Sequence, residues 1–154
     1  MKLISCTIEN FGKLNNVTYD FSGECNTICE DNGWGKSTLA SFIRVMFYGF
    51  KNESKKKLVD KERNRLMPWQ KGVYGGEIVF ETGGVVYSLR RTFGKKQVDD
   101  EFLLVRKDTN VECDDFSCDI GEELFKIDAQ SFERTVFIGQ SDCVTATTDS
   151  INAK

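Results

Sequence analysis

The stretch CEDNGWGKSTLASFIRVMFYGF, residues 29–50, joins a short glycine-rich turn to an apolar run. Gly33 and Gly35 leave backbone N–H groups open to an anion, because no Cβ stands in the way. Lys36 follows at the position from which a lysine reaches the β- and γ-phosphates of a nucleotide, and the Ser37 hydroxyl suits Mg²⁺. The stretch therefore predicts a phosphate-binding loop that opens a helix.

The residues after the turn have the spacing of an amphipathic helix, with Gly49 as its end. Apolar side chains recur at i, i+3, i+4 and i+7, in a stripe made of Leu39, Phe42, Ile43, Met46 and Phe50. The alternative interpretation is a glycine-rich turn capped by Ser37. A cap accounts for Gly35 and Ser37 but gives no reason for Lys36 between them.

The loop, residues 30–38, is predicted to bind ATP with Mg²⁺, with Lys36 also catalytic and Ser37 also a magnesium ligand. The residues expected to contact the nucleotide here are Glu30, Asp31, Asn32, Gly33, Trp34, Gly35, Lys36, Ser37 and Thr38. Trp34 is either a stacking surface for a base or a tolerated residue at a variable position.

Glu30 occupies the position where the phosphate-loop pattern has its first glycine. A carboxylate about 8 Å from the phosphates would cost roughly 2 kcal/mol per phosphate charge at an effective dielectric near 20. We therefore expect the side chains of Glu30 and Asp31 to point away from the phosphates, toward solvent or toward a base such as Lys13.

Composition places the chain among globular proteins. It has 154 residues, 40% of them hydrophobic, with 12 Phe and one Pro, and it carries a net charge of −3. This fits a single domain, residues 1–154, and not a basic DNA-binding module. The six cysteines form no C-x-x-C pair and there is no histidine, so zinc has little support and mostly buried, reduced thiols are expected. With no apolar window of about 18 residues and no signal-peptide pattern, we expect a cytoplasmic protein without a membrane partner.

Alternation of apolar and polar residues predicts strands in both halves of the chain. Gly83-Gly84 is a two-residue hairpin signal between two of them. The expected strands are 2–9, 16–21, 25–29, 74–82, 85–93, 101–108 and 135–140, and the expected further helices are 120–127 and 129–137. The basic stretch 51–66 is expected to be a mobile loop, with contact to nucleotide or DNA as the alternative.

Several phrases together resemble one family of ATPases. They are ISCTIENFGKL, NTICEDNGWGKSTLASFIRVMFYGF, MPWQKGVYGGEIVFE, YSLRRTFG and SFERTVFIGQ. The chain resembles the N-terminal half of an ABC-type ATPase head of the SMC, RecF, RecN and SbcC group, in its YhaN-like branch. The resemblance implies an α/β P-loop NTPase lobe, with a mixed and antiparallel sheet around one P-loop helix.

The resemblance also implies two further site residues. In such heads a glutamine that ends a strand contacts the magnesium and the region of the attacking water, and FIGQ puts Gln140 in that role. Family heads bind the adenine side near the end of the first strand, often through an arginine after NF. Here Gly12 and Lys13 stand at that place, so Lys13 is the candidate contact.

Family ATPases also need an apolar strand that ends in Asp before a catalytic Glu, and a Ser-Gly-Gly-like signature loop from a second head. LFKID ends in Asp128 and LLVRKD in Asp108, but basic residues interrupt both runs, and no Ser-Gly-Gly occurs. We therefore expect the N-terminal lobe alone, inactive without the C-terminal half of the same head. A second head, joined as an ATP-dependent dimer, and DNA are the further expected partners.

Three functions compete at this point. The first is ATP binding by one lobe of an SMC/SbcC-like ATPase, whose hydrolysis serves DNA repair, including double-strand break repair, or chromosome maintenance. The second is a nucleotide-binding switch without hydrolysis. The third is a different P-loop enzyme, such as a small kinase, which would need an acceptor pocket and a lid with arginines.

Overall fold

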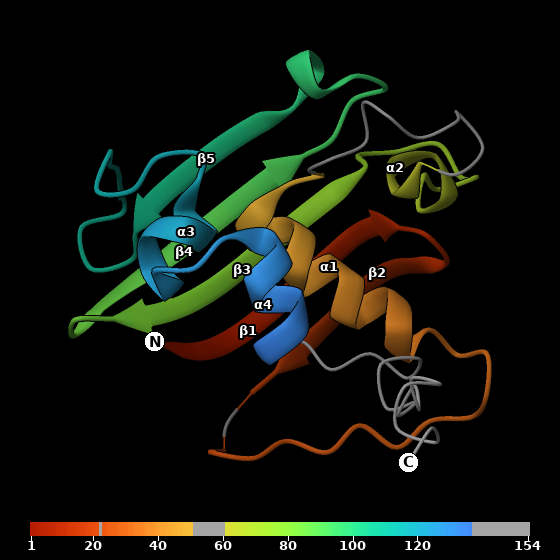
Figure 1. The fold of residues 1–154 in the computed structure, drawn as a ribbon, viewed down its shortest axis with the longest axis horizontal. Helices are drawn as coiled ribbons and strands as arrows, with labels where there is room; N and C mark the ends of the chain where they lie inside the picture. Colours follow the sequence, from red (N-terminus) through yellow and green to blue (C-terminus); the bar gives the residue numbers. More distant parts are fainter. Residues whose placement is uncertain (22, 51–60, 137–154) are drawn as a thin grey trace, which may run out of the picture.

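The computed structural model describes residues 1–21, 23–50 and 61–136. Within these ranges one antiparallel sheet has the order β2-β1-β3-β4-β5-β6 (Figure 1). The strands are β1 Lys2–Phe11, β2 Leu14–Asp20, β3 Gly75–Thr82, β4 Val85–Thr92, β5 Glu101–Arg106 and β6 Val111–Glu112. The helices are α1 Lys36–Tyr48, α2 Glu62–Arg65, α3 Ile120–Phe125 and α4 Ala129–Thr135, with a 3₁₀ turn, η2, at Gln97–Asp99. None of the helices described is long and apolar enough to cross a membrane.

Tight turns join neighbouring strands of this sheet. Gly12, with φ 58°, turns β1 into β2. Gly83 and Gly84, with φ 59° and 79°, join β3 to β4. Positive φ at both central positions is the pattern whose twist matches that of paired strands. The Gly83-Gly84 hairpin was predicted from its glycines, and the structure confirms it.

The two faces of the sheet differ in chemistry. The face toward α1 is apolar and buried, with Cys6, Ile8, Ile78, Phe80, Leu89 and Leu104 at 0–1% exposure. The opposite face carries polar pairs such as Glu77 with Ser88, 2.5 Å apart, and Glu9 with Arg90, also 2.5 Å apart. An antiparallel sheet with one solvated face has this alternation.

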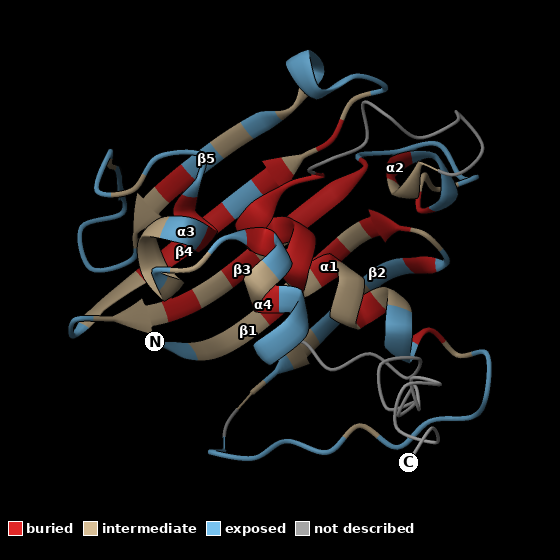
Figure 2. Ribbon diagram, in the orientation of Figure 1, coloured by how far each residue is buried: buried red, intermediate tan, exposed pale blue. Residues whose placement is uncertain are grey.

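Helix α1 lies across the apolar face of the sheet and is buried over most of its length (Figures 1 and 2). It approaches closely at Gly76 of β3, where an added Cβ would lie 3.0 Å from the Phe42 ring and 2.1 Å from the Thr7 carbonyl oxygen. The predicted stripe is therefore correct on this side. Phe47 and Tyr48 are buried as well, because α3 and α4 cover the other side of α1.

Aromatic rings fill both sides of α1. Toward the sheet, Phe11 lies 5.2 Å from Phe42 and 5.6 Å from Tyr74 between ring centroids. Toward α3 and α4, Phe47 lies 5.5 Å from Phe125, and Tyr48 lies 5.0 Å from Phe132. Fully burying one such side chain stabilises the fold by about 1.5–3 kcal/mol. The core thus depends on α1 more than on any other helix.

Two of the predictions about the first half of the chain are wrong, and the mixed sheet is not confirmed. Residues 25–29 form no strand, because no described strand pairs with this segment, and it is largely exposed. Cys25 and Cys29 are consequently exposed, not buried. The described sheet is antiparallel throughout, so the mixed sheet expected from the resemblance is absent from these residues.

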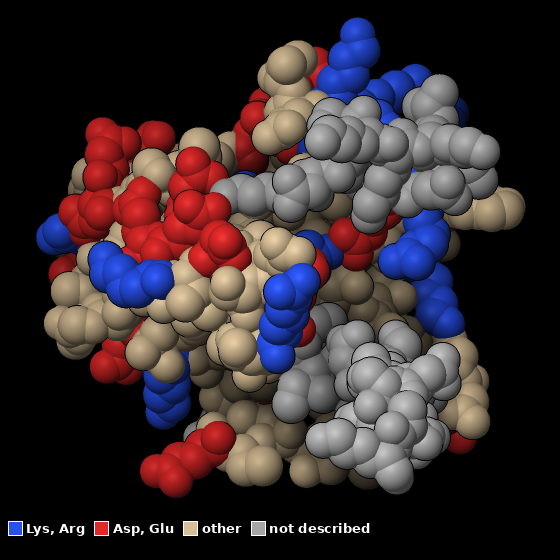
Figure 3. Space-filling view, in the orientation of Figure 1, with Lys and Arg blue, Asp and Glu red and all other residues tan. Residues whose placement is uncertain are grey.

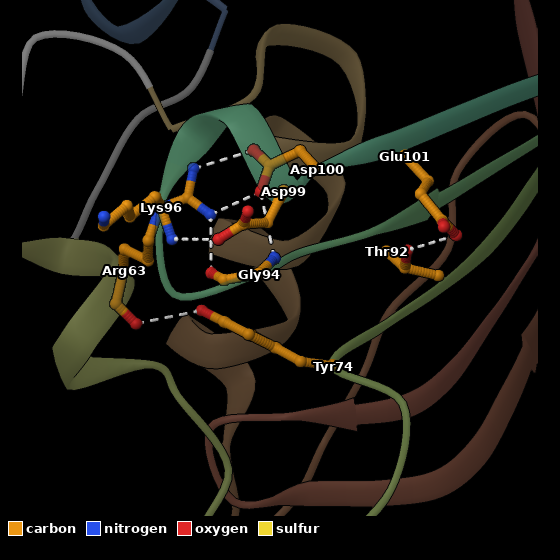
Figure 4. A network of polar contacts seen from close by, with 8 residues as sticks. All are labelled: Arg63, Tyr74, Thr92, Gly94, Lys96, Asp99, Asp100 and Glu101. Atoms are coloured by element: carbon orange, nitrogen blue, oxygen red, sulfur yellow. Dashed lines mark hydrogen bonds and ion pairs between the residues drawn. The ribbon is translucent and has the colours of Figure 1, made fainter.

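The mobile loop predicted at residues 51–66 extends too far, because its last part forms a helix. Residues 51–60 lie outside the described ranges, but Glu62–Arg65 form α2, and Arg63 is 4% exposed. The Arg63 guanidinium makes two hydrogen bonds with the Asp100 carboxylate, of 2.6 and 2.7 Å, and a third with the Gly94 carbonyl (Figure 4). It also lies 4.7 Å from the centre of the Phe50 ring. These partners lie far from Arg63 in the sequence, and they order α2. The charge pattern had suggested that this segment is a solvated loop.

The acidic region near α3 is held to the sheet by another buried cation, Arg91 of β4. Its guanidinium donates to the Cys118 carbonyl and lies 4.9 Å from the centre of the Phe102 ring. Burial lowers the pKa of Arg91 to about 10, so the group is still charged at neutral pH. The predicted helices 120–127 and 129–137 appear here as α3 and α4. Thr135 ends α4, and the remainder of the strand predicted at 135–140 lies outside the described residues from position 137.

The Arg63–Asp100 ion pair gives a prediction for stability. Asp100→Ala leaves a buried guanidinium without its carboxylate and should lower the free energy of unfolding by about 3 kcal/mol. The measurement is urea denaturation followed by circular dichroism. Asp114→Ala, at an exposed position, is the control and should change stability by less than about 0.5 kcal/mol. A similar small effect of Asp100→Ala would show that the ion pair contributes no net stability.

Candidate functional site

The glycine-rich loop leads directly into α1. Gly33 has φ 87° and Gly35 has φ 127°, values that side-chain-bearing residues rarely adopt. A Cβ on Gly35 would lie 2.9 Å from Leu14, which leaves no room for another residue. Gly35 is the N-cap of α1, and no side chain caps the helix there. The first N–H groups of α1 are thus left for a ligand, and the first turn carries no acidic residue to repel an anion.

Lys36 bends back over the loop that precedes it. Its Nζ donates to the Glu30 carbonyl oxygen at 2.5 Å and to the Asp31 carbonyl oxygen at 3.1 Å. An ammonium has three donors, so one remains beyond these two contacts. The Lys36 ammonium therefore lies against the backbone of the loop, and the residue is still exposed to solvent.

Glu30 contributes to the loop through its backbone. It is exposed, and it is absent from the described non-glycine residues with positive φ, so replacing the expected glycine introduces no left-handed strain. Asp31 is exposed in the same way, and its carbonyl also accepts a hydrogen bond from the Trp34 N–H at 3.2 Å. That both side chains point away from the phosphates stays a prediction.

Lys13, in the turn between β1 and β2, lies against the same loop. Its Cε is 3.3 Å from where a Cβ on Gly35 would be, and its Nζ is 4.0 Å from the corresponding point on Gly33. The fold thus brings together Lys13 and Lys36, which are separated by the whole of β2. Two cations beside glycine N–H groups make this a favourable place for an anion.

Trp34 packs against the protein. Its ring lies edge to face on Tyr19 of β2, with centroids 5.8 Å apart, and the residue is half-buried. Burial, assisted by Cys6 and Glu30, raises the pKa of Tyr19. The contact fixes the loop to the edge strand, so Trp34 has a structural partner in addition to any contact with a base.

A cavity of about 600 Å³ continues from the loop. Gly12, Lys13, Ser37, Thr38 and Ser41 line it on one side, and the other side is the segment from Arg65 to Gln70. This volume falls within the range of about 300–1,000 Å³ that is usual for small-molecule sites. Residues 65–70 were not predicted as part of the site, because no phosphate-binding motif includes them. Residues 67–70 belong to the phrase MPWQKGVYGGEIVFE, which supported the resemblance but pointed to no ligand contact.

The surface charge is divided between two sides of the molecule. Figure 3 shows acidic side chains gathered on the left, over α3 and β5, and basic side chains on the right, toward α2. The acidic residues of α3 are Glu122 and Glu123, in its first turn.

The two acids considered as ends of a catalytic strand have local structural contacts. Asp128 is the N-cap of α4, where its side chain accepts from the Ser131 N–H at 2.7 Å. That hydrogen bond lowers the pKa of the Asp128 carboxyl. Asp108 accepts from the Thr109 N–H in the turn after β5, also at 2.7 Å. Gln140, the predicted catalytic and magnesium residue, lies outside the described residues.

Comparison with known proteins identifies the family of this chain. A family model described as AAA domain matches residues 5–153. The chain belongs to the AAA domain family. A second match is to "Uncharacterized protein YhaN" of Bacillus subtilis (strain 168), 35% identical over 82 residues, which is 53% of this chain and 8% of that protein. The chain thus covers far less than two thirds of this relative.

These matches confirm the resemblance drawn from the sequence, to the N-terminal region of an AAA-type ATPase of the SMC- and SbcC-like kind. Membership in the AAA domain family indicates a nucleotide-binding ATPase in general terms. The loop with Lys36 and Ser37 lies inside the matched range.

The exposed side chain of Glu30 gives a prediction for affinity. Glu30→Gly should change ATP affinity by less than about tenfold, or about 1.4 kcal/mol, because neither strain nor a carboxylate at the phosphates is removed. Isothermal calorimetry with MgATP measures this. Gly35→Ala is the contrasting variant and should weaken binding strongly, since its Cβ would meet Leu14. A Glu30→Gly protein that bound a hundredfold tighter would instead identify Glu30 as inhibitory.

Proposed function

We propose that this chain binds MgATP at residues 30–38, as the nucleotide-binding lobe of an SMC/SbcC-like ATPase. The observation that carries the proposal is the uncapped N-terminus of α1 beside a glycine loop that holds the Lys36 ammonium. A triphosphate placed there would meet backbone N–H groups, Lys36 and Lys13 together. The nucleoside would extend into the adjoining cavity.

The residues present suit a magnesium-bound triphosphate. The Ser37 hydroxyl is exposed at the start of α1 and lines the cavity, in the place of the metal-binding hydroxyl of a phosphate loop. Ser37 would hold Mg²⁺ there, and the bound ion would supply positive charge beside the phosphates. Gln140 is proposed as the second metal ligand and as the residue that orients the attacking water. The loop contributes position and charge, which supply most of catalysis in phosphoryl transfer.

Hydrolysis belongs, in this proposal, to the whole protein. The acidic strand end, the catalytic Glu and the signature loop are proposed to come from a C-terminal half of the same head and from a second head. ATP would then hold two heads together, and its hydrolysis would release them. DNA repair, including double-strand break repair, or chromosome maintenance in the cytoplasm is the cellular role that fits the family resemblance.

The test of nucleotide binding is Lys36→Ala. Loss of the ammonium removes charge-assisted contacts to phosphate oxygens, worth roughly 1.5–3 kcal/mol each, so ATP affinity should fall by about 100-fold or more. Calorimetry gives the affinity, and circular dichroism should show an unchanged fold because Lys36 is exposed. Lys95→Ala, exposed and remote from the cavity, should bind ATP normally. Undiminished affinity in Lys36→Ala would refute the assignment of the loop.

A further inference from the structure

The second wall of the cavity is a connection with firm anchors. At its start, the Gly12 N–H donates to the Leu66 carbonyl oxygen at 2.7 Å. At its end, the Asn10 side-chain amide donates to the Val73 carbonyl oxygen at 3.1 Å. The Tyr74 hydroxyl adds a hydrogen bond of 3.1 Å to the Arg63 carbonyl (Figure 4). Both ends of this connection are therefore fixed beside the turn that carries Lys13.

One large apolar side chain on this wall is left without cover. Trp69 is 98% exposed, although it lines the cavity. In the described part of the chain, Trp34 has a ring partner in Tyr19, whereas no ring contact involves Trp69. Pro68 precedes Trp69 and restricts the backbone there. An indole presented at the edge of a cavity on an anchored segment offers a flat surface to a ligand.

The cavity has both polar and apolar lining residues. Ser37, Thr38 and Lys13 come from the loop helix and the β1–β2 turn. The connection after α2 contributes the apolar Leu66, Met67 and Trp69 together with the polar Arg65 and Gln70. A ligand that contacts both segments can combine an anionic part with a flat, weakly polar part. A nucleotide has this form, with phosphates at one end and an aromatic base at the other.

We propose that Trp69 stacks on the base of the bound nucleotide, so that the connection between α2 and β3 recognises the base while the glycine loop holds the phosphates. This inference rests on the proposed nucleotide binding and adds a second recognition element to it. Stacking of a base on an aromatic side chain is tolerant of base identity, since every base has a π-face. The wall therefore distinguishes a nucleotide from a base-free polyphosphate more than it distinguishes one base from another.

The experiment compares two magnesium-bound ligands, ATP and inorganic tripolyphosphate, by isothermal calorimetry. The proteins are the unaltered chain, Trp69→Ala, Trp69→Phe and the control Val98→Ala, which removes a different exposed apolar side chain, 87% exposed and not part of the cavity. Trp69→Ala should weaken ATP binding by at least about fivefold. Trp69→Phe keeps an aromatic face and should remain within about threefold of the unaltered chain. Tripolyphosphate affinity should be the same in all four proteins.

Two results would overturn the inference. Equal ATP affinity in Trp69→Ala and the unaltered chain would show that the indole does not touch the base. An equal loss for ATP and tripolyphosphate would show that Trp69 supports the loop and not the base. Failure of the unaltered chain to bind either ligand would be a different outcome, because it would refute the proposed nucleotide binding itself.

Discussion

Packing of α1 against the apolar face of the sheet determines where the glycine loop opens. The helix is one rigid element, so the position of its N-terminus follows from the rings buried around its middle and its C-terminal half. Phe42 contacts the sheet at Gly76, and Tyr48 contacts α4 through Phe132. A loop that comes before a helix held on two sides has its first N–H groups directed by the core. The direction of these N–H groups is important, because the candidate site would bind a phosphate mostly through backbone groups.

Ion pairs of two buried arginines, Arg44 and Arg63, surround α1. Arg44 of α1 pairs with Glu62 of α2 and, at 3.1 Å, with Glu133 of α4. Arg63, the residue after Glu62 in α2, pairs with Asp100. Such pairs lose hydration when they are buried, so their net contribution to stability is small compared with the cost of removing one partner. Their effect here is positional: α2 has four residues and little hydrophobic surface, and the two arginines determine where it lies.

The sequence predicted the parts of the fold that depend on local rules. Period-two alternation, the glycine pair at positions 83 and 84 and the stripe of α1 each follow from neighbouring residues, and each is present. The sequence-based predictions failed where the structure of a segment depends on a partner far away in the sequence. Arg63 is ordered by a carboxylate 37 residues away. Residues 25–29 have the composition of a strand, but a strand needs a partner ladder, and none of the described strands provides one.

The candidate site also has residues that could be predicted from local spacing and residues that could not. Lys36, Ser37 and the glycines are recognisable because their spacing is itself the site. Lys13 entered through the resemblance, and the structure brings it to the loop across β2. The position of the wall from Arg65 to Gln70 could not be predicted, since it depends on hydrogen bonds from Asn10 and Gly12, more than 50 residues earlier in the chain, to Val73 and Leu66. Its distance in sequence from the loop conceals its proximity in space.

The hydrogen bonds of Lys36 to the carbonyls of its own loop make ligand binding an exchange. A phosphate oxygen that takes the ammonium must replace the contacts with Glu30 and Asp31, so the energy gained is the difference between the two sets. The carbonyl dipoles of Glu30 and Asp31 already neutralise part of the Lys36 charge. If a phosphate binds as proposed, it would compete with these carbonyls for the ammonium, and the carbonyls would accept the ammonium again on release. Such competition would favour reversible binding.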